Sequence, residues 1–511
     1  MNNTTLRLLL LLTLCGVCFV VGMLVGGRGS DTDMRSAERL AVLEFTTAER
    51  DSMQDDLRDF SANYVKTRGV DIPNSLAPAL LFHPLPKGFK LPSGPSRFRP
   101  SASTPVVRPA DLEDLAFAPV TELAALVRAR RVTSVELTRM YQERHRRYGP
   151  MVQCVNTLTD YKALAQAARA DAELAHGIYR GPLHGIPYGA KDLLAQKDHR
   201  TTWGAMPFKD QWIREDATDI RKLEAAGAVL VAKLTLGALA WGDVWYGGTT
   251  KNPWDTTKGS SGSSAGPASA TAAGLVGFAI GSETWGSIVS PSDRCGTTGL
   301  RPTFGRVSRA GAMALSWSMD KLGPICRTVE DCAVVFQAIH GYDPSDPTTV
   351  RDVPFVYDAN LPLRSVRVGY YRSAFDSVKQ NKHLSDSVLT VLHSLGADLV
   401  PVEFPADLPV DHLTHILSAE AAAAFDDLTR SNRDDLMVRQ IKNAWPNVFR
   451  ASRFIPAVEY LQANRVRTLL IEETAELFRT VDVIVAPSFG GNQLLLTNLT
   501  GHPCVVLPMG F

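Results

Sequence analysis

The chain has 511 residues, of which 45% are apolar and 21% are charged, and these fractions are typical of globular proteins. The formal net charge of +1 gives no support to a nucleic-acid partner or an acidic one. The seven cysteines show no Cys/His metal spacing, so we expect no disulfide framework, no metal and no cofactor.

The N-terminus holds a run of eighteen residues without charge, Leu8 to Val25, which follows Arg7. An apolar run of this length lies between a long signal peptide and a short membrane anchor. We therefore predict that residues 1–28 are a signal peptide or a membrane anchor. The protein is then exported or anchored outside the cytoplasm, with membrane association through residues 8–25. The sequence leaves cleavage and anchoring open as alternatives.

Residues 29–110 are predicted to form an N-terminal helix and a Pro-rich extension. One helix is expected around Ala37–Tyr64, and the prolines that follow favour an extended segment or a linker. The main domain is expected to occupy residues 111–511, starting near Leu112.

The main domain alternates between helical and strand patterns. Thr121 is expected to cap a short helix, Thr133 and Glu136 form a capping box, and a helix near Thr218–Ala226 should stop at Gly227. This alternation predicts an α/β fold with a mixed or parallel sheet. The strands are expected at Ala228–Ala232, Val366–Tyr370, Leu399–Val402 and Val483–Ala486.

Gly259 to Gly299 is the most informative stretch of the chain, because nearly all of its residues are small and many are Ser or Gly. A flexible linker can have this composition, but the apolar segment Ala272–Ile280 should be buried. We predict a rigid loop, a helix through the Ala-rich part, a short strand, and a second loop that carries Ser287.

Two patterns suggest nucleophilic chemistry. The Gly-x-Ser-x-Gly string at residues 262–266 would make Ser264 the nucleophile of an α/β-hydrolase elbow. That elbow requires an apolar strand directly before it, whereas residues 252–258 are polar and turn-like. The second pattern is Lys191 in the mostly uncharged segment Gly185–Asp192. A buried lysine has a lowered pKa, so it can be neutral and serve as a base.

Three motifs together resemble the amidase signature family. They are the lysine segment Gly185–Asp192, the Gly/Ser-rich segment Ser261–Gly274, and the string Gly-Ser-Glu-Thr-Trp-Gly-Ser that ends at Ser287. The resemblance implies a mixed, mostly parallel central sheet flanked by helices. It also implies a triad in which Ser287 is the nucleophile, Ser263 is the bridging serine after a cis peptide bond, and Lys191 is the base.

The chemistry that this resemblance implies is amide hydrolysis without a metal. Neutral Lys191 would accept the proton of Ser287 through Ser263, and the acyl group would stay on Ser287 until water releases it. The oxyanion would be bound by the backbone N–H groups of Thr284, Trp285, Gly286 and Ser287. Ser264 and Glu283 are expected to support the site.

The sequence departs from the family pattern around the nucleophile. Trp285 stands where we expect Gly, Glu283 where Asp is usual, and Val289 where the family has Arg. Without that arginine we expect Glu283 to pair with Arg294. The chain ends at Phe511, where the family continues with another strand and helix, so we expect an incomplete C-terminus.

The leading functional hypothesis is a serine amidohydrolase that acts on a small-molecule amide, with no nucleic-acid partner. The first alternative is a protein like the A subunit of glutamyl/aspartyl-tRNA amidotransferase, which works in a cytoplasmic complex. The second is a catalytically impaired homologue, because the bulk of Trp285 could block the nucleophile. A lipid amidase at a membrane is suggested only by the N-terminal apolar run. The region around Trp445 is a candidate pocket wall, and core packing explains it equally well.

Overall fold

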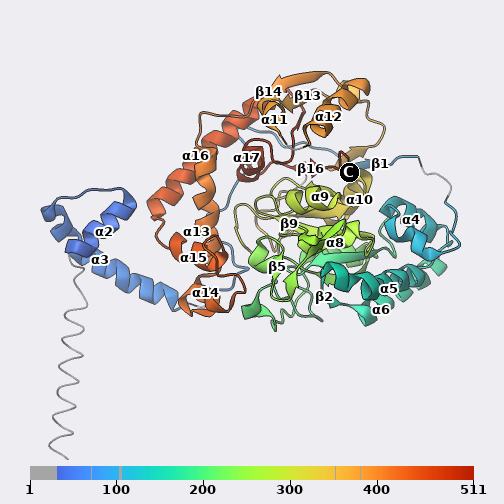
Figure 1. Cartoon of the computed structure of the whole chain (residues 1–511), viewed down its shortest axis with the longest axis horizontal. Coiled ribbons are helices and arrows are strands. Elements are labelled where there is room, and N and C mark those ends of the chain that lie inside the picture. Colours follow the sequence, from blue (N-terminus) through green and yellow to red (C-terminus); the bar gives the residue numbers. More distant parts are fainter. Residues whose placement is uncertain (1–30, 71, 103–105, 352, 380, 511) are drawn as a thin grey trace, which may run out of the picture. The chain divides into compact units, whose positions relative to one another are not determined.

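The protein is described from a computed structural model (Figure 1). The structure describes residues 31–70, 72–102, 106–351, 353–379 and 381–510. The predicted signal peptide or anchor at residues 1–28 lies outside them. The chain divides into two compact units, one ending at Leu76 and the other beginning at Ala77.

The first unit contains two helices, α2 (Asp31–Ala41) and α3 (Thr47–Arg68). The expectation of one helix over Ala37–Tyr64 was therefore wrong. Val42 has a φ of 55°, which breaks the helix, and a capping box of Thr46 and Glu49 starts the next one. No helix in the described part of the chain is long and apolar enough to cross a bilayer.

The second unit begins with the Pro-rich segment, which packs along the domain. Phe82 meets Phe304 edge-on, with ring centroids 5.0 Å apart. Strand β1 (Arg97–Arg99) pairs in parallel with β12 (Val356–Asp358).

A seven-stranded sheet is the centre of the second unit. The three strands β9, β3 and β4 are parallel neighbours, whereas the other four pairs in the sheet are antiparallel. The prediction of a mixed sheet is confirmed, but the sheet is not mostly parallel. β11 inserts between β9 and β10 and runs opposite to both. In spatial order the strands are β16 (Cys504–Val506), β10 (Thr298–Arg301), β11 (Lys321–Cys326), β9 (Phe278–Glu283), β3 (Pro187–Lys191), β4 (Val229–Leu234) and β2 (Val155–Leu158).

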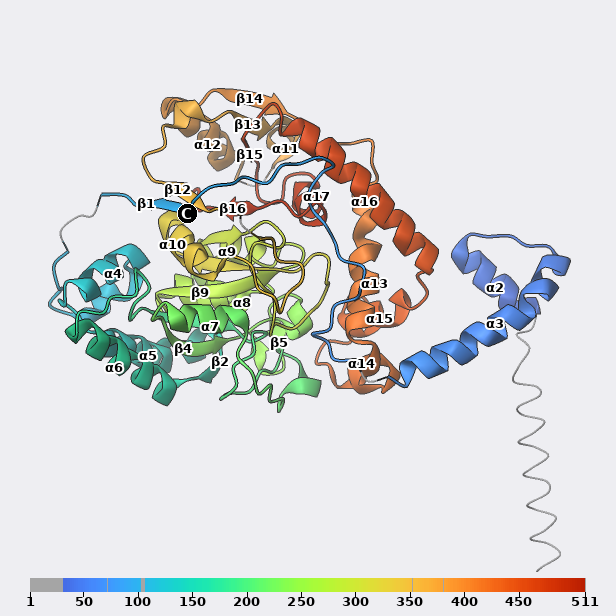
Figure 2. The same ribbon diagram turned by 180° about the vertical axis from the view of Figure 1, so that it is seen from behind.

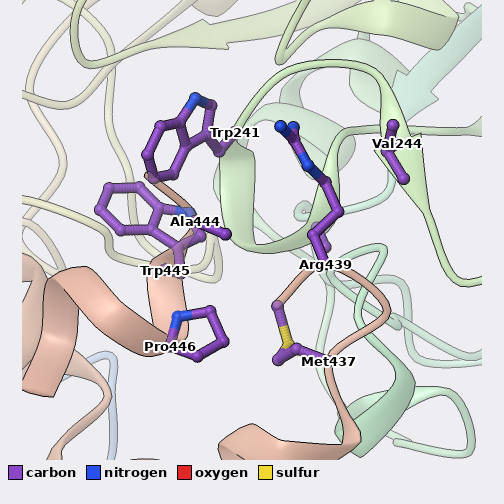
Figure 3. Close-up of a pocket in the computed structure, with 8 residues that line it drawn as sticks. Trp241, Val244, Met437, Arg439, Ala444, Trp445 and Pro446 are labelled. Carbon is purple, nitrogen blue, oxygen red and sulfur yellow. The ribbon is translucent and has the colours of Figure 1, made fainter. Parts of the chain in front are cut away.

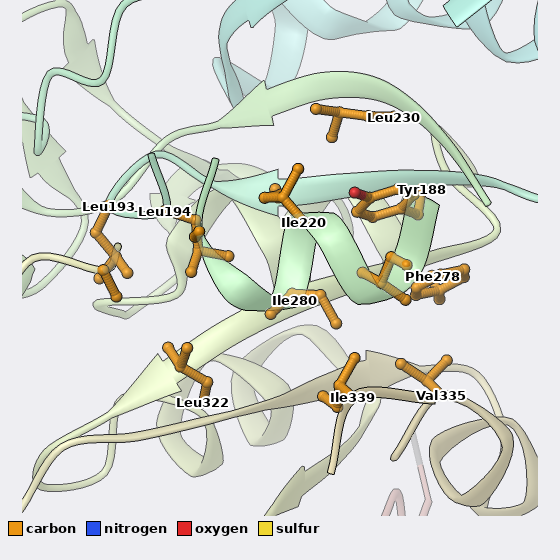
Figure 4. Close-up of a cluster of buried hydrophobic side chains, with 14 of the residues drawn as sticks. Tyr188, Leu193, Leu194, Ile220, Leu230, Phe278, Ile280, Leu322, Val335 and Ile339 are labelled. Carbon is orange, nitrogen blue, oxygen red and sulfur yellow. The ribbon is translucent and has the colours of Figure 1, made fainter. Parts of the chain in front are cut away.

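Helices cover both faces of this sheet, because its central strands are apolar on both sides. On one face, Tyr188 stacks on Phe278 at 5.2 Å, and this pair packs with Ile220 of α7 and Val335 of α10 (Figure 4). On the other face, Val231 and its neighbours pack against the small residues of α6 and α8. The helices around the sheet are α4 (Val120–Arg128), α5 (Ser134–Val152), α6 (Asp160–Ala175), α7 (Thr218–Ala225), α8 (Ala265–Ala272), α9 (Val289–Cys295) and α10 (Val329–Ile339).

The Thr133–Glu136 capping box is present at the start of α5, as predicted. The predicted cap at Thr121 was wrong, because α4 begins at Val120 with Pro119 as its N-cap residue. The backbone N–H of Thr121 instead donates to Asp331 Oδ1 at 3.1 Å, so a carboxylate from α10 takes the capping role.

Three of the predicted strands form a separate parallel sheet, in which β13 (Val368–Tyr371) lies between β14 (Leu399–Val402) and β15 (Val483–Val485). Figure 2 shows this sheet next to the C-terminal helices, where α13 contacts both α15 and α16. The helices of this region are α11 (Arg372–Ser377), α12 (Lys382–Ser394), α13 (His415–Ala424), α14 (Asp426–Arg430), α15 (Trp445–Ser452), α16 (Ala457–Leu477) and α17 (Gln493–Leu499).

Short elements complete the described fold. Two hairpins pair β5 (Val244–Trp245) with β6 (Gly248–Thr249) and β7 (Lys251–Asn252) with β8 (Asp255–Gly259). The 3-10 turns are η1 (Leu112–Phe117), η2 (Met206–Phe208), η3 (Ala238–Ala240), η4 (Leu363–Ser365), η5 (Val410–Thr414) and η6 (Arg433–Leu436).

Candidate active site

The candidate site lies where β3 and β9 end. These neighbouring strands are parallel, with Ala190 opposite Ile280, so Lys191 lies beside the residues that lead into the Ser287 loop. The Gly/Ser-rich segment follows the prediction: a loop runs into α8, β9 follows, and a second loop carries Ser287 before α9. Ser264 N donates to the carbonyl oxygen of Ser287 at 3.0 Å and joins the two loops.

Lys191 is fully buried, and its amine is surrounded by serine oxygens. Nζ lies 2.8 Å from Ser263 Oγ, 3.0 Å from Ser264 Oγ and 2.9 Å from Ser282 Oγ. No carboxylate is within ion-pair distance of this amine among the described residues. Burial lowers the pKa of Lys191 well below its usual range, although the charges of Asp320 and Glu283 act in the opposite direction.

The hydrogen bonds around Lys191 limit which groups its amine can donate to and accept from. Ser264 Oγ donates to the carbonyl oxygen of Ser282 at 2.9 Å and accepts from the Ser282 N–H at 3.0 Å. Because the Ser264 hydroxyl proton is already donated to Ser282, the Ser264 oxygen can only accept a hydrogen bond from Lys191. The second N–H of a neutral amine has Ser282 in reach, at its hydroxyl and at its carbonyl oxygen. The lone pair of a neutral Lys191 amine thus has two hydroxyl groups in reach, those of Ser263 and Ser282.

The Gly262–Ser263 peptide bond is cis, as the resemblance implied. Gly262 leaves no room for a side chain, because a Cβ atom there would lie 1.9 Å from the carbonyl oxygen of Gly242. The loop that contains Gly242 thus packs directly on the backbone that presents Ser263. Ser263 is fully buried, and its described side-chain hydrogen bond is the one with Lys191.

The loop Thr284–Ser287 presents unpaired backbone donors. None of the four N–H groups in this loop bonds to a described residue. Gly286 has a φ of 85°, a conformation that favours glycine. Ser287 is 8% exposed and its hydroxyl bonds to no described residue, so the link between Ser263 and Ser287 stays a prediction. The Trp285 side chain is 45% exposed.

Glu283 stabilises the loop that carries Ser287 by bonding to the residues directly after it. Its Oε2 accepts the N–H groups of Ile288 at 2.8 Å and Val289 at 2.9 Å. Its Oε1 lies 2.6 Å from Arg301 Nη1, and both side chains are fully buried. Burial by itself raises the pKa of Glu283, but the charge and hydrogen bond of Arg301 bring it down to about 2.

The expected Glu283–Arg294 ion pair was therefore wrong. Arg294 is exposed on α9, whereas Arg301 is buried at the end of β10 and pairs with Glu283. Asn498 of α17 also donates to Glu283 Oε1, at 2.8 Å. Sequence reasoning missed both partners because they are 18 and 215 positions away from Glu283.

Two further carboxylates flank the site, the half-buried Asp320 and the fully buried Asp192. Asp320 accepts the hydroxyl of Thr284 at 2.5 Å and the N–H groups of Leu315 and Ser316. Burial raises its pKa. Asp192 lies 2.6 Å from Lys233 Nζ and accepts the hydroxyl of Thr202 at 2.6 Å. The sequence places Asp192 directly after Lys191, but it gives no signal that Lys233 and Thr202 are the partners of Asp192.

The alternative elbow at Ser264 does not form. The strand before it, β8, belongs to a two-stranded hairpin outside the central sheet. The Ser264 hydroxyl is fully buried and bonded to Ser282 and Lys191. This hydroxyl therefore supports the lysine instead of facing a substrate. The described residues contain no group of three or more His, Cys, Asp or Glu side chains placed to hold a metal.

Comparison with known proteins places this geometry in a family. The model of the family described as Amidase matches residues 136–506. The chain belongs to the amidase family. The fold and the enzyme class expected from the motifs, an amide hydrolase of the amidase signature type, are confirmed.

The relatives of this amidase include proteins named as amidotransferase subunits. The A subunit of glutamyl-tRNA(Gln) amidotransferase from Coxiella burnetii (strain RSA 493 / Nine Mile phase I) is 32% identical over 440 residues, which cover 77% of this chain and 90% of the relative. The protein of the same name from Methylococcus capsulatus is 34% identical over 444 residues, which cover 77% of this chain and 90% of the relative.

Solved structures of amidases also match the fold of this chain. The native peptide amidase from Stenotrophomonas maltophilia has a TM-score of 0.69 at 30% identity, covering 78% of this chain and 91% of that chain. A bacterial aryl acylamidase of the amidase signature family has a TM-score of 0.67 at 22% identity, covering 77% of this chain and 90% of that one, which shows the shared fold.

Proposed function

We propose that this amidase cleaves the C–N bond of a small-molecule carboxamide through an acyl-enzyme on Ser287. One observation supports the proposal above all others: a fully buried lysine amine lies 2.8 Å from the Ser263 hydroxyl, and its other contacts are neutral serine oxygens. A serine hydroxyl becomes a strong nucleophile only when a base removes its proton.

The proton path follows from this arrangement. Ser287 Oγ attacks the amide carbon while its proton passes to Ser263, and the Ser263 proton passes to Lys191. The free N–H groups of residues 284–287 stabilise the oxyanion. Lys191 then returns the proton through Ser263 to the leaving nitrogen, the C–N bond breaks, and an ester remains on Ser287. Water attacks this ester by the same path, which releases the carboxylic acid and restores Ser287.

The test is labelling with a fluorophosphonate, followed by peptide mapping. We expect one adduct on Ser287, which Ser287→Ala removes and Lys191→Met strongly slows. Ser290→Ala is the matched control, because Ser290 lies three positions further on and bonds to Ser261 at 2.7 Å. It should label like the wild type. An adduct on Ser264, or none on folded protein, would overturn the proposal and favour a catalytically impaired homologue.

A second candidate is supported by the relatives named as amidotransferase A subunits, which are 32–34% identical. In that function the same triad would release ammonia from glutamine for use on aminoacyl-tRNA. Hydrolysis of glutamine that rises at least tenfold with the partner proteins of such a complex and tRNA would favour it. Hydrolysis of simple amides by the isolated chain, unaffected by those additions, would exclude it.

We also propose that the protein is exported or anchored outside the cytoplasm. The eighteen uncharged residues from Leu8 to Val25 after Arg7 support this localisation. Cell fractionation tests it, and extraction distinguishes its two forms. Release only by detergent indicates an anchor, whereas a soluble extracytoplasmic protein that starts near residue 29 indicates cleavage. Recovery of the intact chain from the cytoplasm would contradict the proposal.

A further inference from the structure

A pocket that is open to solvent lies beside the candidate site (Figure 3). We call it the Trp241–Arg439 pocket. Two indole rings form one wall, with centroids 4.7 Å apart in an edge-on arrangement, and Trp445 Nε1 donates to Leu239 O at 2.9 Å. The pocket therefore has a preformed apolar wall and one cationic side chain, that of Arg439. Its lining includes Trp241, Val244, Met437, Arg439, Trp445 and Pro446.

The pocket is one residue away from the catalytic loop. Gly242 separates the two: its carbonyl oxygen packs on Gly262, the residue before Ser263, and a Cβ atom on Gly242 would lie 3.5 Å from Arg439 Nη1. The next residue, Asp243, accepts the N–H of Ser261 at 3.0 Å. The loop that forms the pocket wall is thus hydrogen-bonded to the loop that presents Ser263.

Arg439 is the unusual member of this pocket. It is half-buried and makes no hydrogen bond or ion pair with any other residue that the structure describes. Nearby acidic residues have other partners, since Asp434 and Asp435 both pair with Arg450. A guanidinium beside two indoles, without a counter-charge of its own, matches the planar carboxylate of a ligand.

We propose that the Trp241–Arg439 pocket binds a carboxylate on the amide substrate. This inference rests on the proposed function, because the same substrate must reach from the pocket to Ser287. The indole wall fits an apolar body, and the guanidinium, which has no partner among the described residues, fits one carboxylate. The substrate class is therefore a monocarboxylate amide with an apolar, preferably aromatic, body.

The binding test uses 4-carbamoylbenzoate and its methyl ester with the full-length Ser287→Ala protein in calorimetry. The two compounds differ only by the carboxylate charge. We expect the acid to bind at least tenfold more tightly than the ester, since a charge-assisted contact contributes a factor of about ten to a hundred. Adding Arg439→Ala should remove the difference between the two compounds, and Arg439→Lys should keep part of it.

The matched control is Lys442→Ala, which removes the same charge from the same exposed segment outside the pocket lining. It should keep the preference for the acid. Equal binding of acid and ester, no binding of either, or the same loss in Lys442→Ala would each overturn the inference. The proposed function is judged separately, because fluorophosphonate labelling of Ser287 in wild-type protein needs no carboxylate.

Discussion

Two buried lysines on neighbouring strands have opposite surroundings. Lys191 ends β3 and Lys233 lies on β4, opposite Ala190, and both side chains are fully buried. The Lys233 amine lies 2.6 Å from the Asp192 carboxylate, which makes a buried ion pair. The Lys191 amine is surrounded by hydroxyl and carbonyl oxygens.

The difference shows that burial alone does not decide what a lysine does. A carboxylate in contact with a buried ammonium keeps it charged and makes it structural, whereas neutral oxygens leave an amine that favours its uncharged form. Asp192 directly follows Lys191 in the chain, yet its side chain contacts the other lysine. The Asp192 carboxylate therefore neutralises Lys233 on the neighbouring strand and leaves the Lys191 amine without a contacting counter-charge among the described residues.

The largest expected effect comes from removing the base. Lys191→Met keeps the length of the side chain and should lower kcat/KM by about 10⁴-fold, because general bases in triads contribute on this scale. The melting temperature should stay close to that of the wild type, since a neutral buried amine is replaced by an apolar group. A variant that keeps more than a tenth of the activity would show that Lys191 is not the base.

The next effect is on stability, at the other lysine. Asp192→Asn leaves the Lys233 ammonium buried without its counter-charge and should lower the free energy of unfolding by about 3–5 kcal/mol. Urea denaturation measures it. Asp255→Asn is the control, because Asp255 pairs with Lys258 at the surface and should have no measurable effect. Equal stabilities of the two variants would contradict the view of Lys233 as a structural ion.

A third variant makes the Lys191 region resemble the Lys233 region. Ser282→Asp places a carboxylate where a hydroxyl now lies 2.9 Å from the Lys191 amine. The pKa of Lys191 should rise, a larger share of the amine should be protonated, and kcat/KM should fall by about a hundredfold. Ser282→Asn has the same shape without the charge and should lose much less. If both variants lose the same activity, shape and not charge explains the loss.

The smallest effect is the pH dependence of the wild-type enzyme. Only the neutral form of Lys191 accepts a proton, so kcat/KM should fall tenfold per pH unit below its pKa and be level above it. Because burial lowers this pKa well below its usual range, the level region should begin well below pH 10. A rate that still climbs steeply through pH 10 would mean that the amine is charged at neutral pH.

Local patterns predicted the parts of the site that depend on neighbouring residues. Loop, helix, strand and second loop between Gly259 and Gly299 follow from small residues around one apolar segment, and the structure confirms them. The cis bond before Ser263 was implied by the motif, and it is present. The roles of Lys191, Ser263 and Ser287 remain predictions that the labelling experiment tests.

Contacts between distant residues could not be predicted from the sequence. Arg301 reaches Glu283 because β11 inserts between β9 and β10, and one chain gives no signal of that strand order. The Lys233–Asp192 pair depends on two strands being neighbours. The Trp241–Arg439 pocket likewise joins segments about 200 positions apart, and only Trp445 could be named in advance as a candidate wall residue.

The bond from Asn498 to Glu283 has a consequence for the order in which the enzyme is made. Synthesis runs from the N-terminus, so Lys191, Ser263 and Ser287 all leave the ribosome long before α17. Until residue 498 has emerged, Glu283 holds the nucleophile loop without one of its two side-chain partners. The loop that carries Ser287 therefore acquires its full support only late in the growth of the chain, after Lys191, Ser263 and Ser287 have all been synthesised.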